Sequence, residues 1–188
     1  AAEAVARLSD LWSRRAPDRI FAHFELPTQA LRQFAETHRN GPSAYPDPYE
    51  RISFWDAHLA ELKDLEDDWL PIAYLSEFDQ GIYAGALGAP IYYMAHTDVG
   101  WISSMAPPIL HDLADIDRLR IDENAEAIRR MDTQCHIFAE NARGKFGIAP
   151  FIVIDAMNFV AEVRGMTQAF EDVLEHPDAV IRLMDFAL

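Results

Sequence analysis

An apolar run near the end of the chain, residues 148–154, most constrains the fold. It reads Ile-Ala-Pro-Phe-Ile-Val-Ile, follows Gly147 and is ended by Asp155. A run of this length between a glycine and a polar residue predicts a strand buried on both faces. Such strands belong to parallel sheets covered by helices, and barrel enzymes carry their chemistry at the carboxyl ends of these strands. Asp155 is therefore the first residue that the pattern indicates as functional.

Segments of strand and helix character alternate along the whole chain. Strand patterns occupy residues 19–26, 69–75, 89–95, 101–110 and 148–154. Amphipathic or capped helix patterns occupy residues 3–15, 28–39, 47–62, 82–87, 112–119 and 122–141. The extended segment at 101–110 can also pair back on the strand before it, across the turn at residues 97–100.

This alternation predicts an α/β fold with mostly parallel strands and outer helices. A closed (β/α)8 TIM barrel takes about 250 residues, and the chain has 188 with too few strands for closure. We therefore expect residues 1–188 to be the N-terminal part of a single β/α barrel domain, with the second half outside this sequence.

Charge and cysteine content narrow the function classes. The formal net charge is -15, from 31 acidic and 16 basic side chains, which disfavours non-specific binding to nucleic acid. A single cysteine, Cys135, excludes an internal disulfide and a cysteine-rich zinc site. The apolar runs are shorter than the roughly 18 residues of a membrane helix. We expect a cytoplasmic protein that acts on a small molecule.

Several carboxylates and one amide follow predicted strands. Glu77 and Asp79 come after the strand at 69–75, where a carboxylate can act as general acid or base or accept a substrate hydrogen bond. The alternatives are a solvated loop or a helix cap by Asp79. Asp155 must be paired, lie in a cavity or cap the next helix, because burial without a partner is unfavourable. Asn158 in the same loop offers a neutral donor and acceptor.

Two pairs of histidine and carboxylate follow other strands. His23 and Glu25 end the first strand, while His96 and Asp98 follow the strand at 89–95. Such groups can move protons or bind a divalent metal. Neither pair has a third ligand at zinc spacing, so we assign no metal ligand in this sequence. The alternative is that all four are hydrogen-bonded loop residues.

Arg164 and Trp101 complete the candidate set. Arg164 precedes Gly165, and its guanidinium fork can bind a substrate carboxylate or another anion. An ion pair with Glu162 or another neighbouring acid is the alternative. Trp101 can line the pocket or belong to the core.

In the order and spacing of several motifs the sequence resembles the uroporphyrinogen decarboxylase-like superfamily, which also contains cobalamin-dependent and zinc-dependent methyltransferases. The motifs are residues 16–20, 75–79 with the helix at 82–87, Trp101 with 107–109, 113–119, 163–165 and 176–180. The resemblance implies a TIM barrel in which Glu77 occupies or neighbours the position of a catalytic aspartate. The arginine-rich signature of the decarboxylases is absent, and an acidic mouth repels a polycarboxylated porphyrinogen.

The resemblance further implies methyl transfer to or from a corrinoid protein or small thiol, or a related decarboxylation. Glu77, Asp155 and His96 are then the catalytic candidates, and His23 can tune protonation. No cofactor is evident in this segment, and zinc would be bound by residues outside it. The alternative is a non-catalytic module that keeps the fold to bind a small ligand or a partner subunit. Open sheet edges also permit a homo-oligomer.

Overall fold

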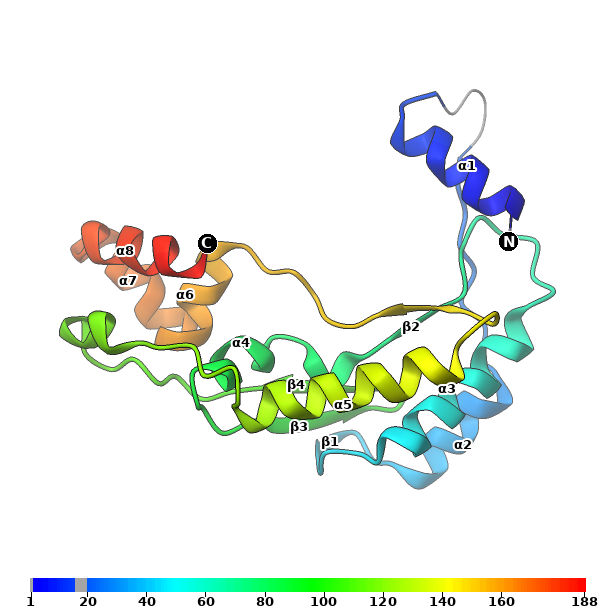
Figure 1. Ribbon diagram of the computed structural model, residues 1–188, viewed down its shortest axis with the longest axis horizontal. Coiled ribbons are helices and arrows are strands. Elements are labelled where there is room, and N and C mark those ends of the chain that lie inside the picture. Colours follow the sequence, from blue (N-terminus) through cyan, green and yellow to red (C-terminus); the bar gives the residue numbers. More distant parts are fainter. Residues whose placement is uncertain (1, 16–19) are drawn as a thin grey trace.

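The computed structural model describes residues 2–15 and 20–188. It is a mixed α/β structure, mostly helical, with two small sheets (Figure 1). The α-helices are α1 (Ala2–Trp12), α2 (Gln29–Thr37), α3 (Pro48–Leu62), α4 (Gly81–Ala86), α5 (Glu126–Asn141), α6 (Ala156–Arg164), α7 (Met166–Glu175) and α8 (Pro177–Ala187). The 3-10 helices are η1 (Ser76–Phe78) and η2 (Leu113–Arg118). The strands are β1 (Gly41–Ser43), β2 (Ile72–Tyr74), β3 (Tyr92–His96), β4 (Trp101–Met105) and β5 (Gly147–Ala149).

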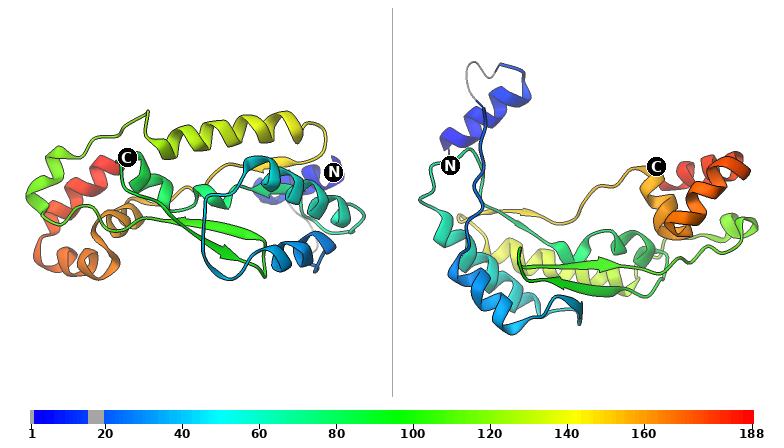
Figure 2. Two further views of the ribbon diagram at one scale, coloured as in Figure 1. Left: turned by 90° about the horizontal axis from the view of Figure 1, so that it is seen from below. Right: turned by 180° about the vertical axis from the view of Figure 1, so that it is seen from behind.

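The molecule is elongated, with α2 and α3 toward one end and α6, α7 and α8 gathered at the other (Figure 1). The long helix α5 runs beside the hairpin of β3 and β4, as both views in Figure 2 show. This middle section holds η1 and α4, which follow β2 directly in the chain.

The larger sheet is antiparallel, in the order β1-β3-β4. Strands β3 and β4 form a hairpin in which His96 lies opposite Trp101 and Tyr92 opposite Met105. The expected return of the chain across residues 97–100 is therefore confirmed. Gly100 in this turn has φ +69°, and a Cβ at that position would overlap the ring of Phe54, so glycine is required for two independent reasons.

The second sheet is a parallel pair, β2 and β5, with Tyr74 opposite Ala149. It is the one parallel pairing among the described residues, so the expectation of a mostly parallel sheet was wrong, and no barrel closes in this part of the chain. The run at 148–154 also differs from its prediction. Its ladder ends at Ala149, because Pro150 has no N–H to donate, and Val153 is 82% exposed.

The first predicted strand, at 19–26, forms no ladder in residues 20–26, and Arg19 lies outside the described residues. Residues 20–28 are extended beside the loop before β2. Asp68 N donates to Ala22 O at 2.9 Å, and Ala22 N donates to a side-chain oxygen of Asp68 at 3.1 Å. Because a side chain replaces a backbone acceptor there, the pairing does not continue into a sheet.

Local capping signals set the helix starts as predicted. Thr28 Oγ1 accepts a hydrogen bond from Leu31 N at 3.1 Å at the start of α2. Asp47 accepts one from Tyr49 N at 2.8 Å at the start of α3, whose first residue is Pro48. A side-chain acceptor at the N-cap satisfies a backbone N–H that the helix leaves free.

The buried apolar residues form separate clusters. The central one joins α3, β2, η1, α4 and α5 around Trp55, Leu75, Phe78 and Phe138. A second cluster lies among α6, α7, α8 and η2, and a third between α2 and the hairpin. Within residues 2–15 and 20–188, no helix combines the length and apolar character needed to cross a membrane.

Candidate functional site

Glu77 lies in a buried polar network. Its side chain is fully buried, and its carboxylate accepts hydrogen bonds from Arg51 Nε and, at 3.1 Å, from Gln134 Nε2. Arg51 Nη2 donates to the carbonyl of Gly100 at 2.9 Å, and the Tyr45 hydroxyl donates to Gln134 Oε1 at 2.7 Å. Burial, followed by the negative charge of Glu77, raises the pKa of Tyr45. The network ties η1 to α3, α5 and the hairpin turn.

Sequence reasoning singled out Glu77 but missed its partners. Arg51 lies on the same face of α3 as Trp55 and Leu59, and Gln134 lies between Met131 and Phe138 on the inner face of α5. A polar residue within an apolar helix stripe was the available signal, because such residues need a buried partner. The geometry makes Glu77 the anchor of η1, and a catalytic role for it stays a prediction.

A cavity of about 400 Å³ lies beside β2, between the extended residues 20–28, α3 and the hairpin turn. It brings together four of the predicted substrate-binding residues, His23, Glu25, Asp98 and Trp101. We call it the tryptophan cavity; its other chemically distinctive lining residues are Trp55, His58, Trp69 and Tyr74. Residues 23 and 98 are 75 positions apart in the sequence, so only the tertiary fold brings these side chains to one surface.

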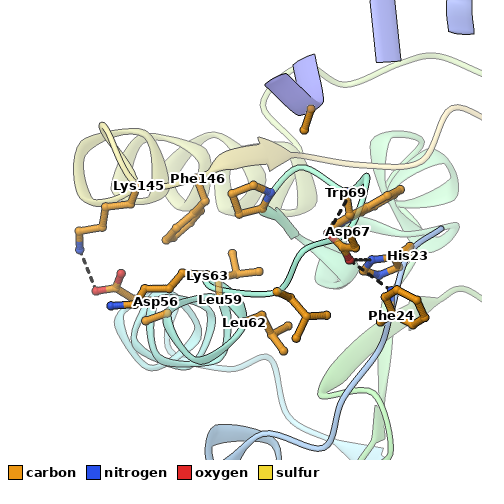
Figure 3. Close-up of a pocket in the computed structure, with 14 residues that line it drawn as sticks. His23, Phe24, Asp56, Leu59, Leu62, Lys63, Asp67, Trp69, Lys145 and Phe146 are labelled. Carbon is orange, nitrogen blue, oxygen red and sulfur yellow. Dashed lines mark hydrogen bonds and ion pairs between the residues drawn. The ribbon is translucent and has the colours of Figure 1, made fainter. Parts of the chain in front are cut away.

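A second cavity, of about 440 Å³, adjoins the first (Figure 3). We call it the lysine cavity, because both lysines of the chain, Lys63 and Lys145, line it. Lys145 Nζ lies 2.7 Å from a carboxylate oxygen of Asp56. The two cavities share His23 and Trp69, whose rings stack with centroids 4.5 Å apart and an interplanar angle of 30°. This stacked pair borders both cavities.

Asp67 orients the His23 ring. His23 Nδ1 lies 3.1 Å from Asp67 Oδ2, and the same carboxylate accepts hydrogen bonds from the backbone N–H groups of Phe24 and Trp69, both at 3.2 Å. Burial alone would raise the pKa of Asp67, but these hydrogen bonds and His23 hold it below its usual value. A carboxylate that fixes one ring nitrogen leaves Nε2 of the imidazole for a ligand or a proton.

His58 lies deeper in the tryptophan cavity. Its Nδ1 is 2.7 Å from Thr28 Oγ1, and its ring meets Trp55 edge to face with centroids 5.8 Å apart. Burial lowers the pKa of His58, against the opposing charges of Glu61 and Glu25. The ring is therefore neutral near pH 7 and provides a polar but uncharged wall.

Tyr74 links this cavity to a second group of predicted residues. Its ring meets Trp101 edge to face at 5.2 Å, and burial, followed by the charges of Asp79 and Glu77, raises its pKa to about 12. His96 is opposite Trp101 in the hairpin, so the two side chains project from the same face.

The second group consists of His96 and Asp79. His96 Nε2 is 2.8 Å from Ser103 Oγ. Burial raises the pKa of Asp79, while the backbone N–H of Gln80 and the His96 charge act in the opposite direction. Asp79 is therefore a half-buried carboxyl with a raised pKa that lies within the electrostatic range of His96.

The remaining predicted residues lie away from both cavities. Asp155 caps α6, accepting a hydrogen bond from Asn158 N at 2.8 Å, and Asn158 Nδ2 bonds the same carboxylate at 3.3 Å. Arg164 is 8% exposed and forms a bidentate ion pair with Asp172, at 2.6 and 3.1 Å. Asp155 and Arg164 adopt the structural alternatives that the sequence left open, and the acid that pairs with Arg164 is Asp172.

Asp155→Ala is expected to lower the free energy of unfolding by about 1 kcal/mol, because the first turn of α6 loses its side-chain acceptor. Urea unfolding measures the change. Ligand affinity at the tryptophan cavity should be unaffected. A large loss of affinity with unchanged stability would restore the pocket role for Asp155.

Among the described residues, no group of three or more His, Cys, Asp and Glu side chains is arranged to hold a metal ion. Comparisons with protein-family models, with curated proteins and with solved structures found no match to this chain. The family resemblance therefore rests on the sequence motifs alone. The tryptophan cavity is a candidate site because of the residues that line it.

Proposed function

We propose that this chain belongs to a uroporphyrinogen decarboxylase-like barrel enzyme that transfers a methyl group to or from a corrinoid protein or a small thiol, or carries out a related decarboxylation. The tryptophan cavity is the substrate site. The observation that carries the proposal is the convergence of His23, Glu25, Asp98 and Trp101 on that one cavity. In the sequence, His23, Glu25 and Asp98 are polar residues at predicted strand ends, and Trp101 is an aromatic candidate for the pocket wall.

The strand arrangement supports the barrel part of the proposal. The parallel pairing of β2 with β5 is the type of contact that a β/α barrel repeats, and residues 20–28 run beside the loop that enters β2. In such a barrel the polar residues that follow the strands form the substrate pocket. Further strands and any zinc ligands would come from residues outside this sequence.

Two features of the site suit the chemistry. Asp67 fixes the His23 ring so that Nε2 can accept or donate a proton. The aromatic walls of the cavity give a bound substrate an apolar surface to pack against. Asp79, whose pKa burial raises, and His96, which is opposite Trp101 in the hairpin, are further candidates for proton transfer.

The test is a methyl-transfer assay with methylcobalamin and a small thiol, using the natural full-length protein with its metal content measured. We expect thioether formation with zinc bound. Trp101→Leu should raise KM about tenfold, because it removes one wall of the substrate site. Trp12→Leu, at a residue that is 91% exposed, is the matched control and should leave KM unchanged. Absence of both methyl transfer and carbon dioxide release from carboxylated substrates would reject the enzyme proposal.

A non-catalytic binding module is the second candidate, and one observation favours it. Glu77, the residue at or near the catalytic position of the related decarboxylases, is engaged by Arg51 and Gln134 in the core. A carboxylate held in this way is not free to act on a substrate. Tight binding of a small ligand without turnover in the same assay would support this candidate.

A further inference from the structure

The walls of the tryptophan cavity are unusually aromatic. Three of the four tryptophans in the chain, Trp55, Trp69 and Trp101, line it together with Tyr74. Tyr74 and Trp101 meet edge to face, and Trp69 stacks with His23. The face of an aromatic ring carries partial negative charge, so several rings around one space attract a cation.

The charged groups that line the cavity also favour a cation, because they are carboxylates. Glu25 and Asp98 lie in its lining, and neither carboxylate has a hydrogen bond or ion pair with another described residue. The lining of this cavity, as far as the structure describes it, contains no lysine or arginine, in contrast to the lysine cavity next to it. The net charge of -15 further raises the local concentration of cations.

One polar atom of the lining residues has no partner. Trp55 is 6% exposed, and its indole Nε1 is buried without a hydrogen-bond acceptor among the described residues. A buried donor of this kind is normally satisfied by protein, water or ligand. This nitrogen is itself shielded from solvent, so a ligand in the cavity meets the rings and the carboxylates, and both attract a positive charge.

We infer that the tryptophan cavity binds an organic cation, of the class of quaternary or methylated ammonium ions. Trp69, Tyr74 and Trp101 enclose the ammonium group, and Glu25 and Asp98 supply the counter-charge. This inference rests on the proposed function in taking the same cavity as the substrate site, and it adds the chemical class of the ligand.

The test compares two probes of the same shape. Choline carries the quaternary ammonium group, and 3,3-dimethylbutan-1-ol is its uncharged carbon analogue. Calorimetric titration of the protein, with tryptophan fluorescence as a second readout, is expected to give at least about tenfold tighter binding of choline, because the neutral analogue lacks the cation–π and carboxylate attraction.

Substitutions in the cavity test whether choline binds there. Trp101→Leu and Asp98→Asn are each expected to weaken choline binding about tenfold, while Trp12→Leu leaves it unchanged. Asp98 is exposed, so its substitution does not disturb the core and serves if Trp101→Leu does not fold. Binding of the neutral analogue should respond to Trp101→Leu and not to Asp98→Asn.

The inference is overturned if choline does not bind, if both probes bind equally, or if Asp98→Asn has no effect. These outcomes are separate from a failure of the proposed enzyme. Methyl transfer that depends on Trp101, without selective choline binding, would reject the cation and keep the enzyme. Selective choline binding without turnover would support the organic-cation site and reject the proposed enzyme activity.

Discussion

Arg51→Ala is expected to lower the free energy of unfolding by about 3–5 kcal/mol, the usual effect of removing one partner of a buried ion pair. Both side chains of the pair Arg51–Glu77 are almost completely shielded from water. Without the guanidinium, the carboxylate of Glu77 keeps only the hydrogen bond from Gln134, and the carbonyl of Gly100 loses its donor. The rings of Phe34 and Phe54 also lose the cation packed 5.4 and 5.0 Å from their centroids.

Urea unfolding measures this loss of stability. Two further variants show whether it comes from the buried ion pair. The double variant Arg51→Met with Glu77→Met should recover much of the stability, because it removes both charges from the interior. Arg118→Ala breaks an exposed pair with Asp115 and should change stability little. If Arg51→Ala were as stable as the unsubstituted protein, the network would not be holding η1 in place.

Arg164→Ala is expected to have an effect of similar size, about 3–5 kcal/mol, on the helices at the other end of the molecule. Arg164 Nε and Nη2 bind Asp172 in α7, while Nη1 donates to the carbonyl of Leu110 at 2.6 Å. The side chain therefore joins α6 to α7 and to the segment before η2. Hydrogen exchange of the amides in α6, α7 and α8 measures the loss locally, and urea unfolding measures it globally.

The same pair makes stability depend on pH. The hydrogen bond from Arg164 is the main reason that the pKa of Asp172 lies below its ordinary value of 3.8. A lowered folded-state pKa means that the stabilisation is complete above pH 3.8 and is lost as the pH falls through the folded-state pKa. Asp172→Asn should therefore be less stable at pH 7 and should lose less stability between pH 4 and pH 2.

The outcome for Arg164→Ala also separates its two interpretations. A stability loss with unchanged ligand affinity agrees with the ion pair. Unchanged stability with a lost affinity for anionic ligands would instead establish the predicted substrate-binding role of Arg164. Arg182→Ala is the matched control, because its ion pair with Asp117 is exposed and joins α8 to η2.

The helix starts could be predicted because their causes are local. Thr28 and Asp47 cap the helices that follow them, and the acceptor and the donor in each cap are at most three residues apart. Asp112 caps η2 in the same way, by accepting a hydrogen bond from Ala114 N at 2.9 Å. A capping side chain needs no tertiary contact to make its hydrogen bond.

The sheets were harder to predict because strand pairing depends on distant partners. Residues 148–154 have the apolar character of a buried strand, but Pro150 interrupts the ladder, and Val153 is left 82% exposed. Residues 20–26 are extended as expected, yet Asp68 pairs with Ala22 in place of a neighbouring strand. The hairpin of β3 and β4 was accessible from the sequence because the turn brings its two strands together locally.

The residues of the candidate site were also predictable only in part. The rule that polar residues at strand ends form the site selected His23, Glu25 and Asp98, and these share a cavity with Trp101. The same rule also selected Asp155, which the structure uses as a helix cap. Being at a strand end is a property of the sequence, but facing a common space is not.

By itself, the sequence determined where α2 and α3 begin, which turn folds β4 back on β3, and that the chain is strongly acidic. The tertiary structure alone decided that Arg51 and Gln134 enclose Glu77, that Asp172 binds Arg164, and that three tryptophans line one cavity. The physical reason is range: caps and turns are hydrogen bonds between residues close in sequence, whereas buried ion pairs and cavity walls depend on side chains that only packing brings together.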